Sequence, residues 1–228
     1  GTPVFGVAVD GSPASSAAFR WTEPDGLQSL GSDPDGNEAV GATADGGVIA
    51  GRSYGSPYEW SLWTEEEGLV PTGVGRATGM SADGAVVSGN GSTGAFRWTE
   101  ATSAVPLTPV GGYGSTGANV VSADGSFIVG SSSGIGIPDG GTHAARWNEA
   151  GVATDLGDLA SGPIDAIAYD VSADGSVVVG QGTVESSSSV NPFVSEAFRW
   201  TEATGMQGLG FLGDGYVSSS ANEVSPDG

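Results

Sequence analysis

One unit of sequence recurs five times along this chain, and this repetition constrains the fold more than any other feature. Each unit contains an Asp-Gly pair, and these pairs begin at Asp45, Asp83, Asp124, Asp174 and Asp227. Each unit also contains a tryptophan at a matching place, namely Trp21, Trp63, Trp98, Trp147 or Trp200. The tryptophans lie 42, 35, 49 and 53 residues apart. Units of this length are typical of β-propeller blades, in which four short strands form one sheet.

The Asp-Gly pair predicts a hairpin. In the fourth unit, β-prone runs flank Asp174-Gly175, which is the strongest short hairpin signal that a sequence offers. Gly accepts a positive φ without steric cost, and Asp bonds the local backbone. The run Val177–Val179 is apolar throughout rather than alternating. Continuous apolarity predicts a strand that is buried on both faces, as in a blade between two neighbours.

The tryptophan belongs to a second strand, Ala-Phe-Arg-Trp-Thr-Glu, which is found at residues 18–23, 95–100 and 197–202. Side chains alternate along a strand, so Phe and Trp share one face and Arg points to the other. Four of the six arginines occupy this position, and the second unit has Leu62 there. We interpret the arginine as a bond to a neighbouring blade, through an ion pair or a backbone carbonyl. A ring of anion-binding arginines is the alternative.

The two ends of the chain complement each other. The last unit stops at Asp227-Gly228, and residues 1–6 match the strand that would follow that turn. The pattern predicts an all-β, five-bladed β-propeller with about four short antiparallel strands per blade, whose last blade is completed by the N-terminal strand. This single domain, residues 1–228, would have repeats at about 24–63, 64–98, 99–147 and 148–200, and a last repeat, 201–228, completed by 1–23. Alternatively, the N-terminal strand completes the last blade of a neighbouring copy and builds a filament, or the chain is cut from a longer array.

The composition limits the partners. The formal net charge is −21, and all six cationic residues are Arg. Such a chain repels phosphate backbones and anionic lipids, so we expect no nucleic-acid partner. The same charge favours cations, above all Ca²⁺. The chain has no Cys, which excludes disulfides and thiolate chemistry. No apolar run reaches the length of a membrane span, so we expect no membrane insertion.

Several segments together match a known repeat. They are residues 197–206, Gly208-Leu209-Gly210, residues 221–225, and Ser-Ala-Asp-Gly-Ser-Val-Val-Val-Gly at 172–180. The chain resembles the bacterial HAF-type extracellular repeat family over essentially its whole length, in five copies. It departs from the family's His-Ala-Phe in every copy, and only His143-Ala144-Ala145 keeps the His. The resemblance implies an extracellular or cell-surface address, and it supplies no catalytic residues.

One loop carries oxygen ligands at alternate positions around a glycine. Asp33, Asp35, Asn37 and Glu38 surround Gly36, in the manner of a shortened calcium loop. The loop lacks the full twelve-residue spacing and the terminal bidentate Glu, so a polar turn is the alternative. Calcium is the one cofactor that the sequence brings into consideration.

Extra aromatic residues occur in the second unit and recur in no other. They are Tyr54, Tyr58 and Trp60. Aromatic rings stack on sugar faces, so these residues are candidates for carbohydrate binding. Trp60 shares a strand face with Leu62, and packing inside a blade is the alternative for it.

The sequence offers no catalytic constellation. His143 is the one histidine, it has no nucleophile elbow nearby, and the absence of Lys excludes a phosphate loop. We therefore expect a non-enzymatic, exported structural or adhesive surface protein that self-associates as a filament or surface-layer subunit through strand complementation between chain ends. The first alternative is a carbohydrate-binding, lectin-like propeller with extracellular polysaccharide as its partner. A weaker alternative is a polysaccharide-degrading enzyme that uses loop carboxylates.

Overall fold

In the part of the chain that the structure describes, all regular structure is β-sheet apart from one short turn of 3-10 helix. The computed structural model describes residues 4–9, 16–30, 37–54, 58–134, 140–159, 165–186, 192–213 and 217–228. Among these residues, the 3-10 turn is Val110–Gly112, and no helix is long and apolar enough to cross a membrane. The chain divides into two compact units, residues 1–105 and 106–228, and each is described by itself.

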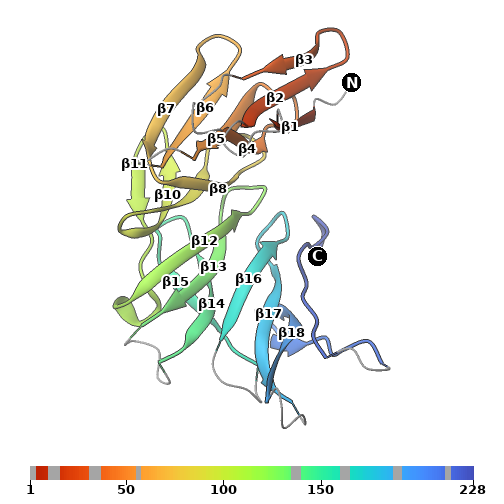
Figure 1. Cartoon of the computed structure of the whole chain (residues 1–228). Coiled ribbons are helices and arrows are strands. Elements are labelled where there is room, and N and C mark those ends of the chain that lie inside the picture. Colours follow the sequence, from red (N-terminus) through yellow and green to blue (C-terminus); the bar gives the residue numbers. More distant parts are fainter. Residues whose placement is uncertain are drawn as a thin grey trace. The chain divides into compact units, whose positions relative to one another are not determined.

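The first unit contains three antiparallel sheets, each built from consecutive strands (Figure 1). One sheet has three strands, β1 (Val4–Val9), β2 (Ser16–Thr22) and β3 (Gly26–Ser29). The next has four, β4 (Asn37–Ala42), β5 (Val48–Ser53), β6 (Glu59–Thr64) and β7 (Gly68–Val74). The third consists of β8 (Arg76–Met80), β9 (Val87–Gly91), β10 (Gly94–Thr99) and β11 (Ser103–Pro106), which reaches the unit boundary.

The second unit contains two four-stranded sheets with the same order (Figure 1). The first consists of β12 (Ser115–Val121), β13 (Ile128–Ser133), β14 (Thr142–Trp147) and β15 (Ala153–Gly157). The second consists of β16 (Ala166–Val171), β17 (Val177–Glu185), β18 (Phe193–Thr201) and β19 (Gly205–Gly208). In every four-stranded sheet the Asp-Gly turn joins the first two strands, and the repeat tryptophan lies on the third.

Four of the five Asp-Gly turns are fixed by a serine or threonine two residues earlier. In the last sheet, the buried Ser172 hydroxyl donates to Asp174 Oδ1 at 2.9 Å and accepts the Val177 N–H at 2.9 Å. Gly175 has a φ of 75°, which favours glycine. The equivalent hydroxyls of Thr43, Ser81 and Ser122 make the same bond to their aspartates. The hairpins predicted at these Asp-Gly pairs are therefore confirmed.

The glycine that closes each hairpin faces a bulge in the first strand. The register between β16 and β17 shifts between Ala168 and Asp170, opposite Gly180. A Cβ on Gly180 would lie 2.0 Å from the Ile167 carbonyl oxygen and 2.8 Å from the Phe198 ring. The same bulge lies opposite Gly51, Gly89 and Gly130. The strands can approach only because this position has no side chain.

The expected closed five-bladed propeller, with its last blade completed by the N-terminal strand, is wrong. The N-terminal strand β1 pairs with β2 in a sheet of three strands. Residues 217–228 form no strand. They are hydrogen-bonded to the sheet that precedes them, where the Ala221 N–H donates to the Gly180 carbonyl and the Ala173 N–H donates to the Pro226 carbonyl. These bonds, rather than pairing with β1, hold the C-terminal residues.

Substitution of Gly180 by Ala should destabilise the protein by about 1–3 kcal/mol, because the added methyl group overlaps backbone that cannot move aside. Urea unfolding of the two proteins measures the difference. Gly213→Ala is the matched control, since a Cβ there meets open space. Equal losses from both substitutions would show that the close approach at Gly180 is not a constraint.

The aspartates in the Asp-Gly turns should make the stability of the folded chain depend on pH. Hydrogen bonds from Ser176 and Ser172 lower the pKa of Asp174 from 3.8 to about 2. A carboxylate whose pKa is lower in the folded chain stabilises it above the ordinary pKa, and this stabilisation is lost as pH falls. The difference in melting temperature between the wild type and Asp174→Asn should therefore shrink between pH 4 and 2. A difference that stays constant across that window would contradict the account.

Candidate functional site

An arginine joins the two sheets of the second unit. Arg146 on β14 lies over Trp200 on β18, with its Cζ 4.8 Å from the ring centroid. Its Nη1 donates a 2.9 Å hydrogen bond to the carbonyl of Gly175, in the turn of the next sheet. Burial lowers the pKa of Arg146, and the Glu202 carboxylate opposes part of that shift. Three groups of the following sheet thus surround the guanidinium: the ring of Trp200, the carboxylate of Glu202 and the carbonyl of Gly175. We call this set of three groups, and the equivalent set in any other sheet, the arginine receptor.

The same kind of contact joins the first two sheets of the first unit. Arg20 on β2 lies over Trp63 on β6, with its Cζ 5.4 Å from the ring centroid. Its Nη1 is 3.9 Å from Oε2 of Glu65, which follows Trp63 by two residues. The glutamate side chain is 86% exposed, so this ion pair contributes little and the ring contact carries more. The predicted role of these arginines as bonds between neighbouring sheets is confirmed at both places.

The junction between sheets β4–β7 and β8–β11 has an arginine receptor without its arginine. Leu62 stands at the arginine position on β6, and it has neither charge nor donor. The receptor residues of the next sheet are Trp98, Glu100 and Gly84. These three residues and Leu62 line a cavity of about 860 Å³. That volume lies within the usual range for small-ligand sites.

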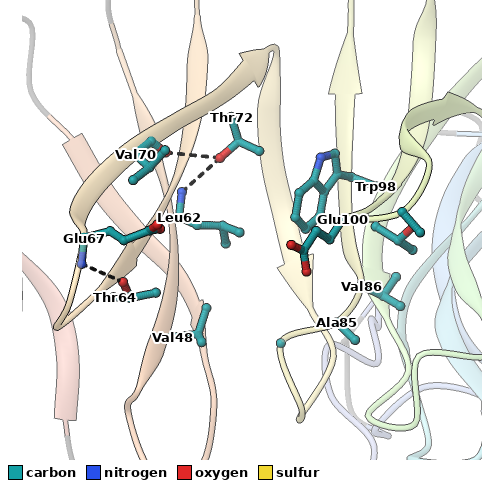
Figure 2. Close-up of a pocket in the computed structure, with 13 residues that line it drawn as sticks. Val48, Leu62, Thr64, Glu67, Val70, Thr72, Ala85, Val86, Trp98 and Glu100 are labelled. Carbon is teal, nitrogen blue, oxygen red and sulfur yellow. Dashed lines mark hydrogen bonds between the residues drawn. The ribbon is translucent and has the colours of Figure 1, made fainter.

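Figure 2 shows how the walls of this cavity differ. Leu62 and Trp98 lie on opposite sides, and the carboxylates of Glu67 and Glu100 flank the space between the two sheets. Thr72 Oγ1 is engaged, because it accepts the Leu62 N–H at 3.2 Å and donates to the Val70 carbonyl at 3.1 Å. The cavity therefore combines an aromatic ring, two carboxylates and aliphatic side chains.

The three carbohydrate candidates lie in different environments. Trp60 is only 1% exposed and packs against Trp98 and Phe96, with ring centroids 5.1 and 6.0 Å apart. It therefore offers no face to a sugar and supports the Trp98 ring instead. Tyr54 and Tyr58 are 42% and 48% exposed. Sugar binding at these two tyrosines stays a prediction.

Two of the four calcium candidates lie outside the described residues, namely Asp33 and Asp35. The other two use their oxygens for bonds within the protein. Asn37 Oδ1 accepts the Ala18 N–H, and Glu38 Oε2 accepts hydrogen bonds from Arg52 and Tyr54. Burial raises the pKa of Glu38, but these bonds outweigh it and leave the pKa lowered. Among the described residues, no group of three or more acidic or histidine side chains is arranged so that it could hold a metal ion, and calcium stays a prediction.

His143 takes part in a structural hydrogen bond rather than an evident triad. It is buried on β14, and its Nδ1 lies 2.8 Å from Asp155 Oδ1. Ser132 faces it across the β13–β14 pair. The buried Ser132 hydroxyl, however, donates to the Ser115 carbonyl and accepts the Val110 N–H. Its hydrogen bonds thus hold the neighbouring backbone, and the serine is not presented to a substrate.

The sheet β1–β3 lacks the first strand that the other four sheets possess. Strand β1 is at the edge of its sheet, and three of its valines, Val4, Val7 and Val9, are 53%, 43% and 72% exposed. Trp21 on β2 is 37% exposed. An apolar edge strand of this kind is a template for pairing with another strand.

The C-terminal residues have the features that this sheet lacks. The turn Ser225–Gly228 is closed by a 2.9 Å bond from the Gly228 N–H to the Ser225 carbonyl. Arg199 Nη2 donates to the Gly228 carbonyl at 3.4 Å, as Arg146 does to Gly175. The Val224 N–H donates to Asp170 Oδ2 at 2.8 Å. Residues 221–228 form no strand, but they lie against the last sheet at the place that the first strand and turn of a further repeat would occupy.

The comparisons with known proteins show the fold. No protein-family model and no curated protein matches the sequence. The resemblance to HAF-type repeats therefore stays a prediction. Among solved structures, TolB from Acinetobacter baumannii superposes with a TM-score of 0.59 at 16% identity, over 91% of this chain and 52% of that one. The chain thus spans about half the length of that TolB chain.

Two further structures have the same kind of likeness. Hydrazine synthase from Kuenenia stuttgartiensis has a TM-score of 0.53 at 13% identity, over 92% of this chain and 67% of that one. A chain of a nidogen/laminin complex has a TM-score of 0.53 at 11% identity, over 96% of this chain and 82% of that one. The chain therefore has a β-propeller-like, all-β fold. Identities this low carry no information about its activity.

Replacement of Arg146 by Leu gives this repeat the leucine that the second repeat has at Leu62. It should weaken the junction between sheets β12–β15 and β16–β19. It removes a charge-assisted hydrogen bond and two ring contacts, with Trp200 and with Phe127, so we expect a loss of about 1–2 kcal/mol in the free energy of unfolding. Arg20→Leu should cost less, because its ion pair is long and exposed. Urea unfolding measures both. An unchanged stability for Arg146→Leu would contradict a joining role for the arginine.

Proposed function

We propose that the protein is a non-enzymatic, exported structural or adhesive subunit that associates head to tail with copies of itself. The observation that carries this proposal is the match between two incomplete repeats. Among the described residues, sheet β1–β3 has no fourth strand and no Asp-Gly turn, whereas residues 221–228 contain such a turn after a segment that lies at the place of a first strand. Addition of a strand to an exposed edge is a common way to join proteins.

The arginine contact supports the same pairing. Trp21 is an exposed receptor tryptophan, and Arg199 is already bonded to the turn carbonyl at Gly228. When residues 221–225 of one copy pair with β1 of the next, Arg199 of the first copy lies over Trp21 of the second. The contact joins two different surfaces, so it can propagate from copy to copy.

Charge sets the conditions for association. With a formal net charge of −21, copies repel each other at low ionic strength. Salt screens this repulsion, so association should strengthen as salt is raised from about 0.01 to 0.15 M, where the Debye length falls to about 8 Å.

Sedimentation velocity of the whole chain over a range of concentrations tests the proposal. We expect the mass to rise with concentration and with salt, and filaments to be visible by electron microscopy. Trp21→Ala and Arg199→Ala should each weaken association by about two- to fivefold, which corresponds to one exposed cation–π contact. The double variant should be no weaker than the worse single one, because both remove the same contact.

Leu27→Ala is the matched control for Trp21→Ala. Leu27 is 65% exposed and lies opposite Trp21 in the β2–β3 pair. Its strand, β3, is at the other edge of the sheet from β1. It should leave the mass distribution unchanged. A wild-type chain that stays monomeric at every concentration and salt level would contradict the proposal.

The second candidate, a carbohydrate-binding role, is favoured by the surroundings of the two exposed tyrosines. Glu38 is bonded to Arg52 and Tyr54, and Arg76 lies over Tyr58 with its Cζ 5.6 Å from the ring centroid. Carboxylate, guanidinium and aromatic groups together are suited to sugar hydroxyls and faces. Glycan-array binding that is lost in Tyr58→Ala would support this candidate. Binding that survives both Tyr54→Ala and Tyr58→Ala would remove it.

A further inference from the structure

The cavity beside Leu62 lies where one repeat has a leucine at the position that is arginine in the other four repeats. At one other junction in each unit an arginine on the preceding sheet occupies the arginine receptor, namely Arg20 and Arg146. At this junction the receptor consists of Trp98, Glu100 and the Gly84 carbonyl, and the Leu62 side chain carries neither a charge nor a hydrogen-bond donor. The protein thus retains a binding surface for a guanidinium group without a side chain of its own to fill it.

We propose that this cavity is a binding site for a guanidinium-bearing ligand. The planar cation would stack on the Trp98 ring, as the Arg146 guanidinium lies over Trp200 at 4.8 Å. It would pair with the Glu100 carboxylate, as Arg20 does with Glu65 at 3.9 Å. It would donate to the Gly84 carbonyl, as Arg146 does to Gly175 at 2.9 Å.

The rest of the cavity fits the remainder of such a ligand. Glu67 adds a second carboxylate from the opposite sheet, and this strengthens the preference for a cation. Val48, Val70 and Val86 provide aliphatic walls for an apolar stem. The volume of about 860 Å³ exceeds that of a guanidinium group alone, so the site has room for the chain that bears it.

The Trp98 ring is held ready for stacking. Trp60 meets it edge to face, with ring centroids 5.1 Å apart and an interplanar angle of 78°. Trp60 is itself buried and recurs in no other repeat. A fixed ring loses less conformational entropy when a ligand stacks on it. Trp60, which the other repeats lack, and Leu62, which stands at the arginine position, thus both lie at this site.

Agmatine is the probe for a free guanidinium compound, and N-carbamoylputrescine, in which a neutral urea replaces the guanidinium, is its matched control. Calorimetric titration of the intact protein should show agmatine binding at least about tenfold more tightly than the urea compound. The Trp98 indole N–H resonance, assigned with Trp98→Phe, should shift on titration.

A capped Gly-Arg-Gly peptide tests whether the guanidinium group belongs instead to an arginine of another protein. Tighter binding of the peptide would identify a protein partner, tighter binding of agmatine would identify a small molecule, and either result supports the proposal.

Leu62→Arg supplies the arginine that the other repeats have and should weaken agmatine binding by at least about tenfold. Leu62→Met keeps an apolar side chain of similar size and should bind as the wild type does. Glu100→Gln removes an exposed charge without disturbing the core and should weaken binding by about threefold, which tests the site even if Leu62→Arg does not fold. Equal binding of agmatine to the wild type and Leu62→Arg, equal binding of the two probes, or an unmoved Trp98 resonance would overturn the proposal.

Discussion

The contact of an arginine with the tryptophan, glutamate and turn glycine of the following sheet is the interaction on which the arrangement of neighbouring sheets depends. A single β-sheet cannot bury both of its faces, so each repeat needs its neighbour. In the second unit the Arg146 guanidinium spans the gap between sheets and bonds to both Trp200 and Gly175. The Ser-x-Asp-Gly turn holds that carbonyl in place, and the closing glycine lets the strands of each sheet approach. The scaffold is therefore one set of local bonds, repeated.

Both roles that we propose concern places where this set of contacts is incomplete. At Leu62 the arginine is absent and a cavity remains. Beside Trp21, the apolar strand β1 is an exposed edge of its sheet among the described residues. Residues 221–228 and Arg199 form the opposite half of such a junction. We propose two different consequences of one contact: a ligand site beside Leu62, and an association surface at β1 and Trp21.

Much of the local structure could be predicted from the sequence, because local chemistry determines it. Asp174-Gly175 predicted a hairpin, and Arg146 was expected to bond to a neighbouring sheet. The cavity was not predicted, although Leu62 visibly breaks the pattern. Leucine in place of arginine leaves a cavity only where the arginine would have filled a space between two sheets. The size of that space depends on how two segments that are distant in the sequence pack together. Trp60 was ambiguous for the same reason, because burial of an aromatic side chain depends on Trp98 and Phe96 in another sheet. Closure of the ring was predicted incorrectly, since complementary sequence at the two ends does not determine which strand the C-terminal residues contact.

If the arginine receptor is the unit from which sites are made, removal of an arginine elsewhere should create a new one. The direct measurement is calorimetric titration of Arg146→Leu with agmatine, compared with the wild type. The account predicts one additional equivalent of agmatine bound, together with a shift of the Trp200 indole resonance that the wild type does not show. An unchanged stoichiometry and an unmoved Trp200 resonance in a folded Arg146→Leu protein would contradict it.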